Sequence, residues 1–151
     1  MREEYNKLKK KFSLPEFEKL DFDFEITAIE EPQKFLLRNI RRKIMEKLDY
    51  FTKIIEDMLQ AEPMLPNVYE CRFFTDEEKV KIFDLYKNLM RINREGMLLM
   101  IDDGEEADAQ FIKEIALEYP KIQESLRKIA SKAIKGWIKE PTTKEELGYL
   151  G

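Results

Sequence analysis

The chain has 151 residues, of which 43% are hydrophobic and 38% charged, enough for one domain with a core and a strongly ionic surface. Its 27 Lys and Arg residues against 31 Asp and Glu residues give a net charge of −4, so no overall positive field draws it to nucleic acid. Histidine is absent, which excludes Ser–His and Cys–His nucleophilic pairs and histidine-ligated zinc.

Two short segments, 21–26 and 68–74, suggest extended structure, and a short helix precedes the first of them. Residues 2–12 have apolar side chains at helical spacing and predict a short helix. The next segment, DFDFEI at 21–26, alternates polar and apolar residues, which is typical of a strand. VYECRFF at 68–74 is short, apolar and aromatic. We therefore expect extended segments near 21–26 and 68–74, paired as a small ribbon or, for the second, a buried connector.

A long amphipathic helix is predicted from Pro32 to Ala61. Its apolar residues recur at steps of three and four, which places them on one face of a helix. That stripe consists of Leu37, Ile40, Ile44, Leu48, Phe51, Ile55 and Met58. The stripe is broad enough to require at least two neighbouring helices, so this helix is expected to lie at the centre of the fold.

The first half of this helix also carries a dense basic cluster. The candidate binding residues on this basic helix face are Lys34, Arg38, Arg41, Arg42 and Lys47. Residues three and four apart share a helix face, so these cations are suited to neutralise an anionic partner. The alternative is that they are solvated or paired with the acidic residues just upstream.

A second long helix is predicted from Thr75 to Ile101. Thr75 and Glu78 have the spacing of a capping box, in which each side chain accepts a hydrogen bond from the other residue's backbone N–H. Gly96 in the middle of the helix is unfavourable by about 1 kcal/mol relative to alanine. Its presence indicates that another helix approaches closely there.

The segment 102–108 is strongly acidic but lacks the ligand spacing of a calcium loop. We interpret it as a turn between helices, with Gly104 in the left-handed conformation. Helices are then predicted over 107–119 and 121–139, separated by Pro120, which cannot continue the backbone hydrogen bonding. Trp137 is expected to anchor the bundle rather than a ligand.

The C-terminal tail, residues 141–151, follows Pro141 and is predicted to lie outside the helical domain of residues 1–140. It ends with three apolar side chains between two glycines, Leu147, Tyr149 and Leu150. A polar spacer followed by such a group is typical of a short docking peptide. The alternative is that the tail folds back onto its own bundle.

Composition also sets the expected compartment and chemistry. The single cysteine, Cys71, excludes an internal disulfide and points to a reducing compartment. No apolar run reaches about 18 residues, so a cytoplasmic location and no membrane partner are expected. Abundant lysine and glutamate are typical of thermophilic proteins. No cofactor, no metal and no catalytic residues are predicted.

Together these features predict a single all-α domain, a bundle of about five or six helices. The leading hypothesis for function is a non-enzymatic interaction or adaptor protein that binds a protein partner through a helix face or the C-terminal tail. Self-association is a further expectation, because the apolar stripe is longer than a small bundle covers. The alternative is nucleic-acid binding through the basic face of helix 32–61.

One family resemblance moves the adaptor hypothesis toward nucleic-acid machinery. RRKI at 41–44, TDEEKVKIFDLYKNL at 75–89 and the pair Arg94 and Glu95 resemble the helical domain of archaeal GINS replication subunits, over about a third of the chain. The small β-domain of that family is not evident in the sequence. The resemblance therefore favours a role in replication or repair without assigning the family.

Overall fold

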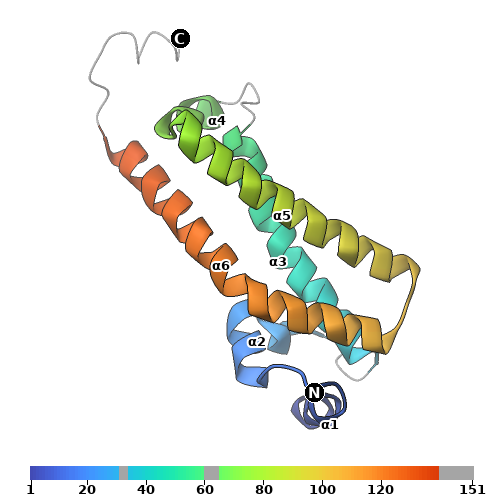
Figure 1. Cartoon of the computed structure of the whole chain (residues 1–151). Coiled ribbons are helices and arrows are strands. Elements are labelled where there is room, and N and C mark those ends of the chain that lie inside the picture. Colours follow the sequence, from blue (N-terminus) through green and yellow to red (C-terminus); the bar gives the residue numbers. More distant parts are fainter. Residues whose placement is uncertain (31–33, 60–64, 140–151) are drawn as a thin grey trace. The chain divides into compact units, whose positions relative to one another are not determined.

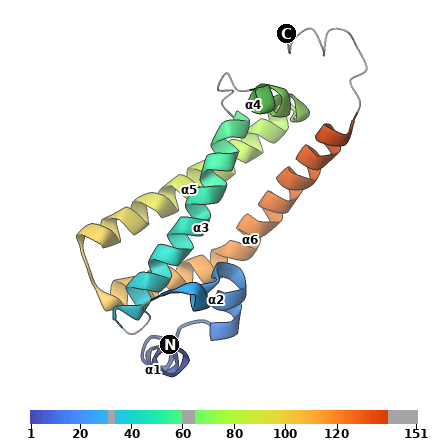
Figure 2. The same ribbon diagram turned by 180° about the vertical axis from the view of Figure 1, so that it is seen from behind.

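The computed structural model describes residues 1–30, 34–59 and 65–139, and these residues form an all-α structure, as predicted (Figure 1). Figure 2 shows the same helices from behind. The described elements are α1 (Arg2–Phe12), α2 (Phe17–Phe24), the 3-10 turn η1 (Ile26–Ala28), α3 (Leu36–Leu59), α4 (Leu65–Glu70), the 3-10 turn η2 (Cys71–Phe73), α5 (Asp76–Ile101) and α6 (Glu105–Ile138).

The predicted extended segments are wrong, because both are helical. Residues 21–24 belong to α2, whose buried residues Phe17, Leu20 and Phe24 recur at steps of three and four. Phe22 is 84% exposed, although strict alternation would place it on the same face as Phe24. The buried residues of this segment therefore follow the period of a helix and not the two-residue period of a strand. The second segment, 68–74, is likewise taken up by α4 and η2.

The two long helices largely follow their predicted ranges. Pro32 and Ala61 lie outside the described residues, and Phe35 has a left-handed φ of 55°, which ends regular helix geometry on the N-terminal side of Leu36. At the start of α5, Glu78 donates its N–H to the Thr75 hydroxyl at 3.2 Å, and Thr75 donates its N–H to the Glu78 carboxylate at 3.3 Å. The predicted capping box is confirmed.

Pro120 does not separate two helices, as the sequence predicted, but lies inside the continuous helix α6. A proline lacks the N–H that would bond to the carbonyl four residues earlier. Here that carbonyl belongs to Ala116, and it accepts a hydrogen bond from Lys19 Nζ at 3.3 Å. A side chain from α2 therefore replaces the missing backbone donor, and Pro120 itself lies on the exposed side of the helix.

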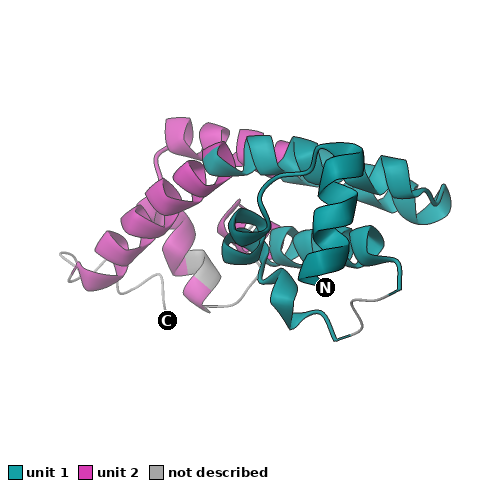
Figure 3. Cartoon of the chain, turned by 90° about the horizontal axis from the view of Figure 1, so that it is seen from below, with its two compact units in different colours: residues 1–51, 89–120 teal, residues 52–88, 121–151 magenta. Residues whose placement is uncertain are grey.

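The chain divides into two compact units, shown in teal and magenta in Figure 3. Unit 1 comprises residues 1–51 and 89–120, and unit 2 comprises residues 52–88 and 121–151. Helices α3, α5 and α6 each contribute a segment to both units. The expectation that residues 1–140 fold as a single domain stays a prediction.

Unit 1 is organised around the docking of α2 on α3 and α6. Phe24 packs against Tyr119, with ring centroids 4.6 Å apart. Lys47 Nζ donates to the carbonyl of Asp23 at 2.6 Å, which fixes the end of α2 to α3. The buried Tyr5 hydroxyl donates to the carbonyl of Pro15 at 2.8 Å, and burial raises its pKa well above the ordinary value.

Unit 2 packs the short α4–η2 segment against the C-terminal part of α6. The Trp137 ring lies 5.1 Å from Tyr69 and 5.6 Å from Phe73, measured between centroids. Trp137 Nε1 also donates to a carboxylate oxygen of Glu70 at 2.6 Å. The core of this unit includes Ile55, Met58, Phe74, Ile82, Leu85, Ile122 and Ala133.

Candidate functional site

The predicted basic helix face is divided between the core and the surface of unit 1. Arg41 is 1% exposed, and its Nε donates to Asp108 Oδ1 at 2.5 Å. Its Nη1 donates to the carbonyl of Gly96 at 3.1 Å. The guanidinium thus joins α3 to α5 and α6 inside the unit, where no anionic partner reaches it.

The other four residues of that face have different surroundings. Arg38 forms an ion pair with Asp103 and lies over the Phe35 ring, 4.4 Å from its centroid. Lys47 is held by the Asp23 carbonyl, as described above. Lys34 and Arg42 are exposed. The five residues therefore do not form one continuous exposed face, and a binding role for Lys34 and Arg42 stays a prediction.

The acidic segment 102–108, which joins α5 to the first turn of α6, supplies the partners of these arginines. Asp108 is 2% exposed and neutralises Arg41, and Asp103 pairs with Arg38. The predicted left-handed conformation of Gly104 is wrong, because no described glycine has a positive φ. Gly96 does mark a close approach, since a Cβ there would lie 2.3 Å from Met45 Sδ.

The tail residues Leu147, Tyr149 and Leu150 lie outside the described part of the chain, so the docking-peptide hypothesis stays a prediction.

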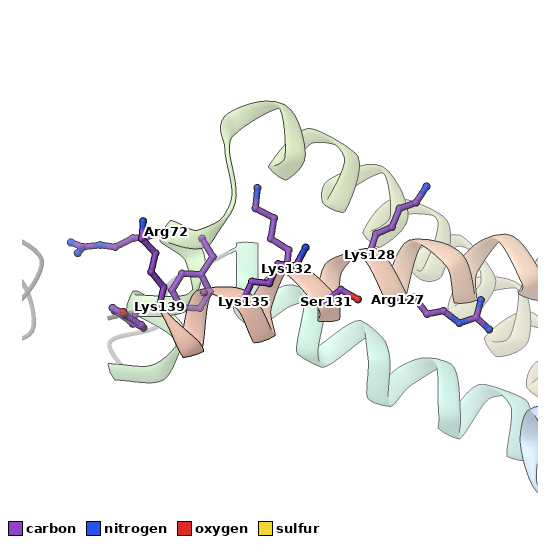
Figure 4. Close-up of a pocket in the computed structure, with 10 residues that line it drawn as sticks. Arg72, Arg127, Lys128, Ser131, Lys132, Lys135 and Lys139 are labelled. Atoms are coloured by element: carbon purple, nitrogen blue, oxygen red, sulfur yellow. The ribbon is translucent and has the colours of Figure 1, made fainter. Parts of the chain in front are cut away.

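A pronounced basic groove, with a volume of about 800 Å³, lies instead within unit 2 (Figure 4). It is formed by the C-terminal part of α6 and by the α4–η2 segment. Six cationic side chains line it, and we define the basic groove by them: Arg72, Arg127, Lys128, Lys132, Lys135 and Lys139. Figure 4 shows them distributed along α6 from Arg127 and Lys128 to Lys139, with Arg72 near the Lys139 end.

Four of these cations form a row along the C-terminal part of α6, the lysine row of Lys128, Lys132, Lys135 and Lys139. Lys139 lies one residue past the end of the helix, and its N–H still donates to the Lys135 carbonyl at 3.2 Å. Spacings of four, three and four residues keep the four lysines within an arc of about 60° on the helix. The row rises about 16 Å along the axis and offers roughly one ammonium group per turn. The groove is therefore suited to an extended anion with repeated charges more than to a single compact one.

The aromatic side of the groove is built by Tyr69 and Phe73. Their rings meet edge to face, with centroids 5.0 Å apart. Phe73 is seated directly on Gly136 of α6, where a Cβ would lie 2.3 Å from the ring. A glycine at this position therefore allows the ring to reach the helix. Both rings are half-buried and keep part of their surface toward the groove.

Two carboxylates partly balance the row. Glu78 forms an ion pair with Lys132, and the hydrogen bond from Lys132 lowers the pKa of Glu78 below its ordinary value. Glu124 lies 3.2 Å from Lys128. Lys135 and Lys139 form no ion pair with any carboxylate in the described part of unit 2. The positive charge of the basic groove is therefore only partly neutralised.

This groove was not predicted from the sequence, although one signal for it is present there. Lysines at 128, 132, 135 and 139 repeat with the helical period, on the face opposite to the apolar residues. Such a row is ordinarily a solvated helix face. What makes it a groove is the packing of Tyr69, Arg72 and Phe73 beside it, which depends on tertiary contacts.

Other types of site find no support in the part of the chain that the structure describes. Within residues 1–30, 34–59 and 65–139, no group of three or more Cys, Asp or Glu side chains is placed to hold a metal ion. None of the described helices is long and apolar enough to cross a membrane. No protein-family model, curated protein or solved structure shows significant similarity to the chain.

Proposed function

We propose that the protein is a non-enzymatic interaction protein and that its basic groove binds a polyanionic partner. The observation that carries this proposal is the lysine row, which places four ammonium groups along one side of a groove. Polyanion binding by such an array is driven largely by release of the counterions around the partner. The proposed binding surface is therefore the basic groove of unit 2 and not the basic face of helix 32–61 that the sequence suggested.

The electrostatics of the groove favour binding despite the negative net charge. The chain carries −4 overall, but screening in physiological salt limits charge interactions to about 8 Å. A bound polyanion therefore responds mainly to the six local cations and to the nearby carboxylates of Glu70, Glu78 and Glu124. Five of the six cations that define the groove are exposed, and Lys132 is half-buried, so a partner reaches them without a conformational change.

The proposal is tested by titrating the full-length protein with heparin, a flexible polyanion without bases, and following Trp137 fluorescence. Trp137 contacts Tyr69 and Phe73 and is the only tryptophan, so it reports on the groove. Charge reversal by Lys135→Glu with Lys139→Glu is expected to weaken binding at least about tenfold.

The matched control is Lys7→Glu with Lys10→Glu. These two exposed lysines lie in α1 of unit 1, and their reversal changes the net charge by the same amount. Heparin affinity in the control should stay within about twofold of the parent at physiological salt. Equal losses in both double variants, or no binding by the parent, would overturn the proposal.

A further inference from the structure

We infer that the polyanion held by the basic groove is a single strand of nucleic acid, with its phosphates along the lysine row and bases stacked on Tyr69 and Phe73. This inference rests on the proposed function and adds the chemical class of the partner. It is carried by the combination of a linear row of cations with aromatic rings in the same groove.

The aromatic rings distinguish a nucleic acid from other polyanions. Proteins that bind single strands without sequence preference combine a positive groove along the backbone with aromatic side chains on which bases stack. Tyr69 and Phe73 are half-buried and border the cations, so their rings are held in place while part of their surface faces the ligand. Oligoglutamate and polyphosphate have no aromatic group to stack on these rings.

The rings also favour a single strand over a duplex. In a duplex the bases are already stacked on one another, so their faces are unavailable to a protein side chain unless the helix is unstacked. A single strand presents both its phosphates and its base faces. The exposed Ser131 hydroxyl, which lies beside the row and between Lys128 and Lys132 along the helix axis, adds a neutral hydrogen-bonding group for a phosphate or sugar oxygen.

The aromatic side of the groove is held in place by specific packing contacts and a hydrogen bond. Phe73 contacts the α6 backbone at Gly136, and Trp137 supports both rings from the neighbouring helix position. The hydrogen bond from Trp137 Nε1 to Glu70, at 2.6 Å, fixes the orientation of the tryptophan. Rings that are already ordered lose little conformational freedom when a base stacks on them.

The test uses fluorescence anisotropy with labelled oligothymidine of about twelve nucleotides, within the site sizes of such grooves. The same full-length protein is titrated with a duplex of equal length, with oligoglutamate of equal charge and with heparin. We expect the single strand to bind at least about fivefold more tightly than the duplex or the peptide, and to quench Trp137 fluorescence.

Variants of Tyr69 separate stacking from charge. Tyr69→Leu removes the ring and should weaken oligothymidine binding about tenfold while heparin affinity stays within about twofold. Tyr69→Phe keeps the ring and should restore oligothymidine affinity to within about twofold of the parent. Unchanged heparin binding by Tyr69→Leu also shows that the groove has kept its fold.

The outcomes distinguish this inference from the proposed function. If heparin binds but oligothymidine does not, the inference fails and the polyanion-binding function stands. Equal affinity for single strand and duplex, with no effect of Tyr69→Leu, would likewise refute the inference. Oligoglutamate that binds as tightly as oligothymidine would identify an acidic protein segment as the partner class and also overturn it. If neither heparin nor oligothymidine binds, both proposals fail.

Discussion

The ion pair between Arg41 and Asp108 gives the most quantitative prediction for the fold. Both side chains are almost fully buried, at 1% and 2% exposure, and their atoms approach to 2.5 Å. The pair lies within unit 1 and joins α3 to the first turn of α6. The variant Asp108→Asn keeps the shape of the side chain but leaves the Arg41 charge buried without a counterion.

The expected loss follows from the burial of that charge. Breaking a buried pair from one side costs about 3–5 kcal/mol, because the remaining charge is neither solvated nor neutralised. For a chain of this size, 1 kcal/mol corresponds to about 2–4 °C in Tm, so Asp108→Asn should lower Tm by about 6–20 °C. Replacing both partners, with Arg41→Met and Asp108→Leu, should recover most of the loss, since the desolvation cost disappears as well.

Urea unfolding followed by circular dichroism measures the free energy of unfolding for the parent, Asp108→Asn, the single variants Arg41→Met and Asp108→Leu, and the double variant. The matched control is the partly exposed pair Arg38 and Asp103, with side chains 25% and 49% exposed, for which Asp103→Asn should cost no more than about 1 kcal/mol. A loss below about 1 kcal/mol for Asp108→Asn, or a double variant no more stable than the singles, would refute the reasoning.

Three further predictions concern the core and the groove. Ile44→Asp should prevent folding, because it places an unpaired charge at a fully buried position, and circular dichroism would show the loss of helix. Glu78→Gln retains the capping-box geometry but removes the carboxylate that pairs with Lys132, so heparin should bind about a few-fold more tightly. Oligothymidine affinity should fall with salt with a log–log slope of about −3 for four phosphates, and Lys135→Ala with Lys139→Ala should reduce its magnitude by about 1.4. Three results would contradict these predictions: an Ile44→Asp variant as stable as the parent, an unchanged heparin affinity in Glu78→Gln, and an unchanged salt slope in Lys135→Ala with Lys139→Ala.

The parts of the fold that the sequence predicted are those set by local periodicity. The stripe through Ile40, Ile44 and Leu48 follows the helical repeat, and all three side chains are buried as expected. The cap of α5 depends only on Thr75 and Glu78, three residues apart, so it could be predicted without knowledge of tertiary contacts. The all-α class follows from several such signals together.

The errors arose where a distant residue changed the local outcome. Pro120 ought to end a helix, but Lys19, about a hundred positions away in the chain, bonds to the carbonyl that Pro120 leaves without a donor. Arg41 has the sequence spacing of a cation on an exposed helix face. Its burial depends on the ion pair with Asp108 of α6, which the sequence around Arg41 does not reveal. DFDFEI alternates like a strand, yet it lies in α2 and the start of η1, and the elements described in the structure include no strand that could pair with it.

The candidate site was the least predictable part, for a related reason. The lysine row is visible in the sequence as a helical repeat, but its meaning depends on Tyr69 and Phe73 lying beside it. Those residues belong to a segment that the sequence analysis interpreted as extended or as a connector. Its helical turn, and the seat for Phe73 at Gly136, come from packing against α6 that no local pattern specifies.

The most direct test of the basic groove as a binding site for single-stranded nucleic acid is the anisotropy titration of oligothymidine against the parent, Lys135→Glu with Lys139→Glu, and Lys7→Glu with Lys10→Glu, at one physiological salt concentration. Binding by the parent and by the α1 control, with at least about a tenfold loss in the groove variant, is the predicted result. Equal binding by all three proteins would place the nucleic acid elsewhere on the chain and contradict the assignment of the basic groove.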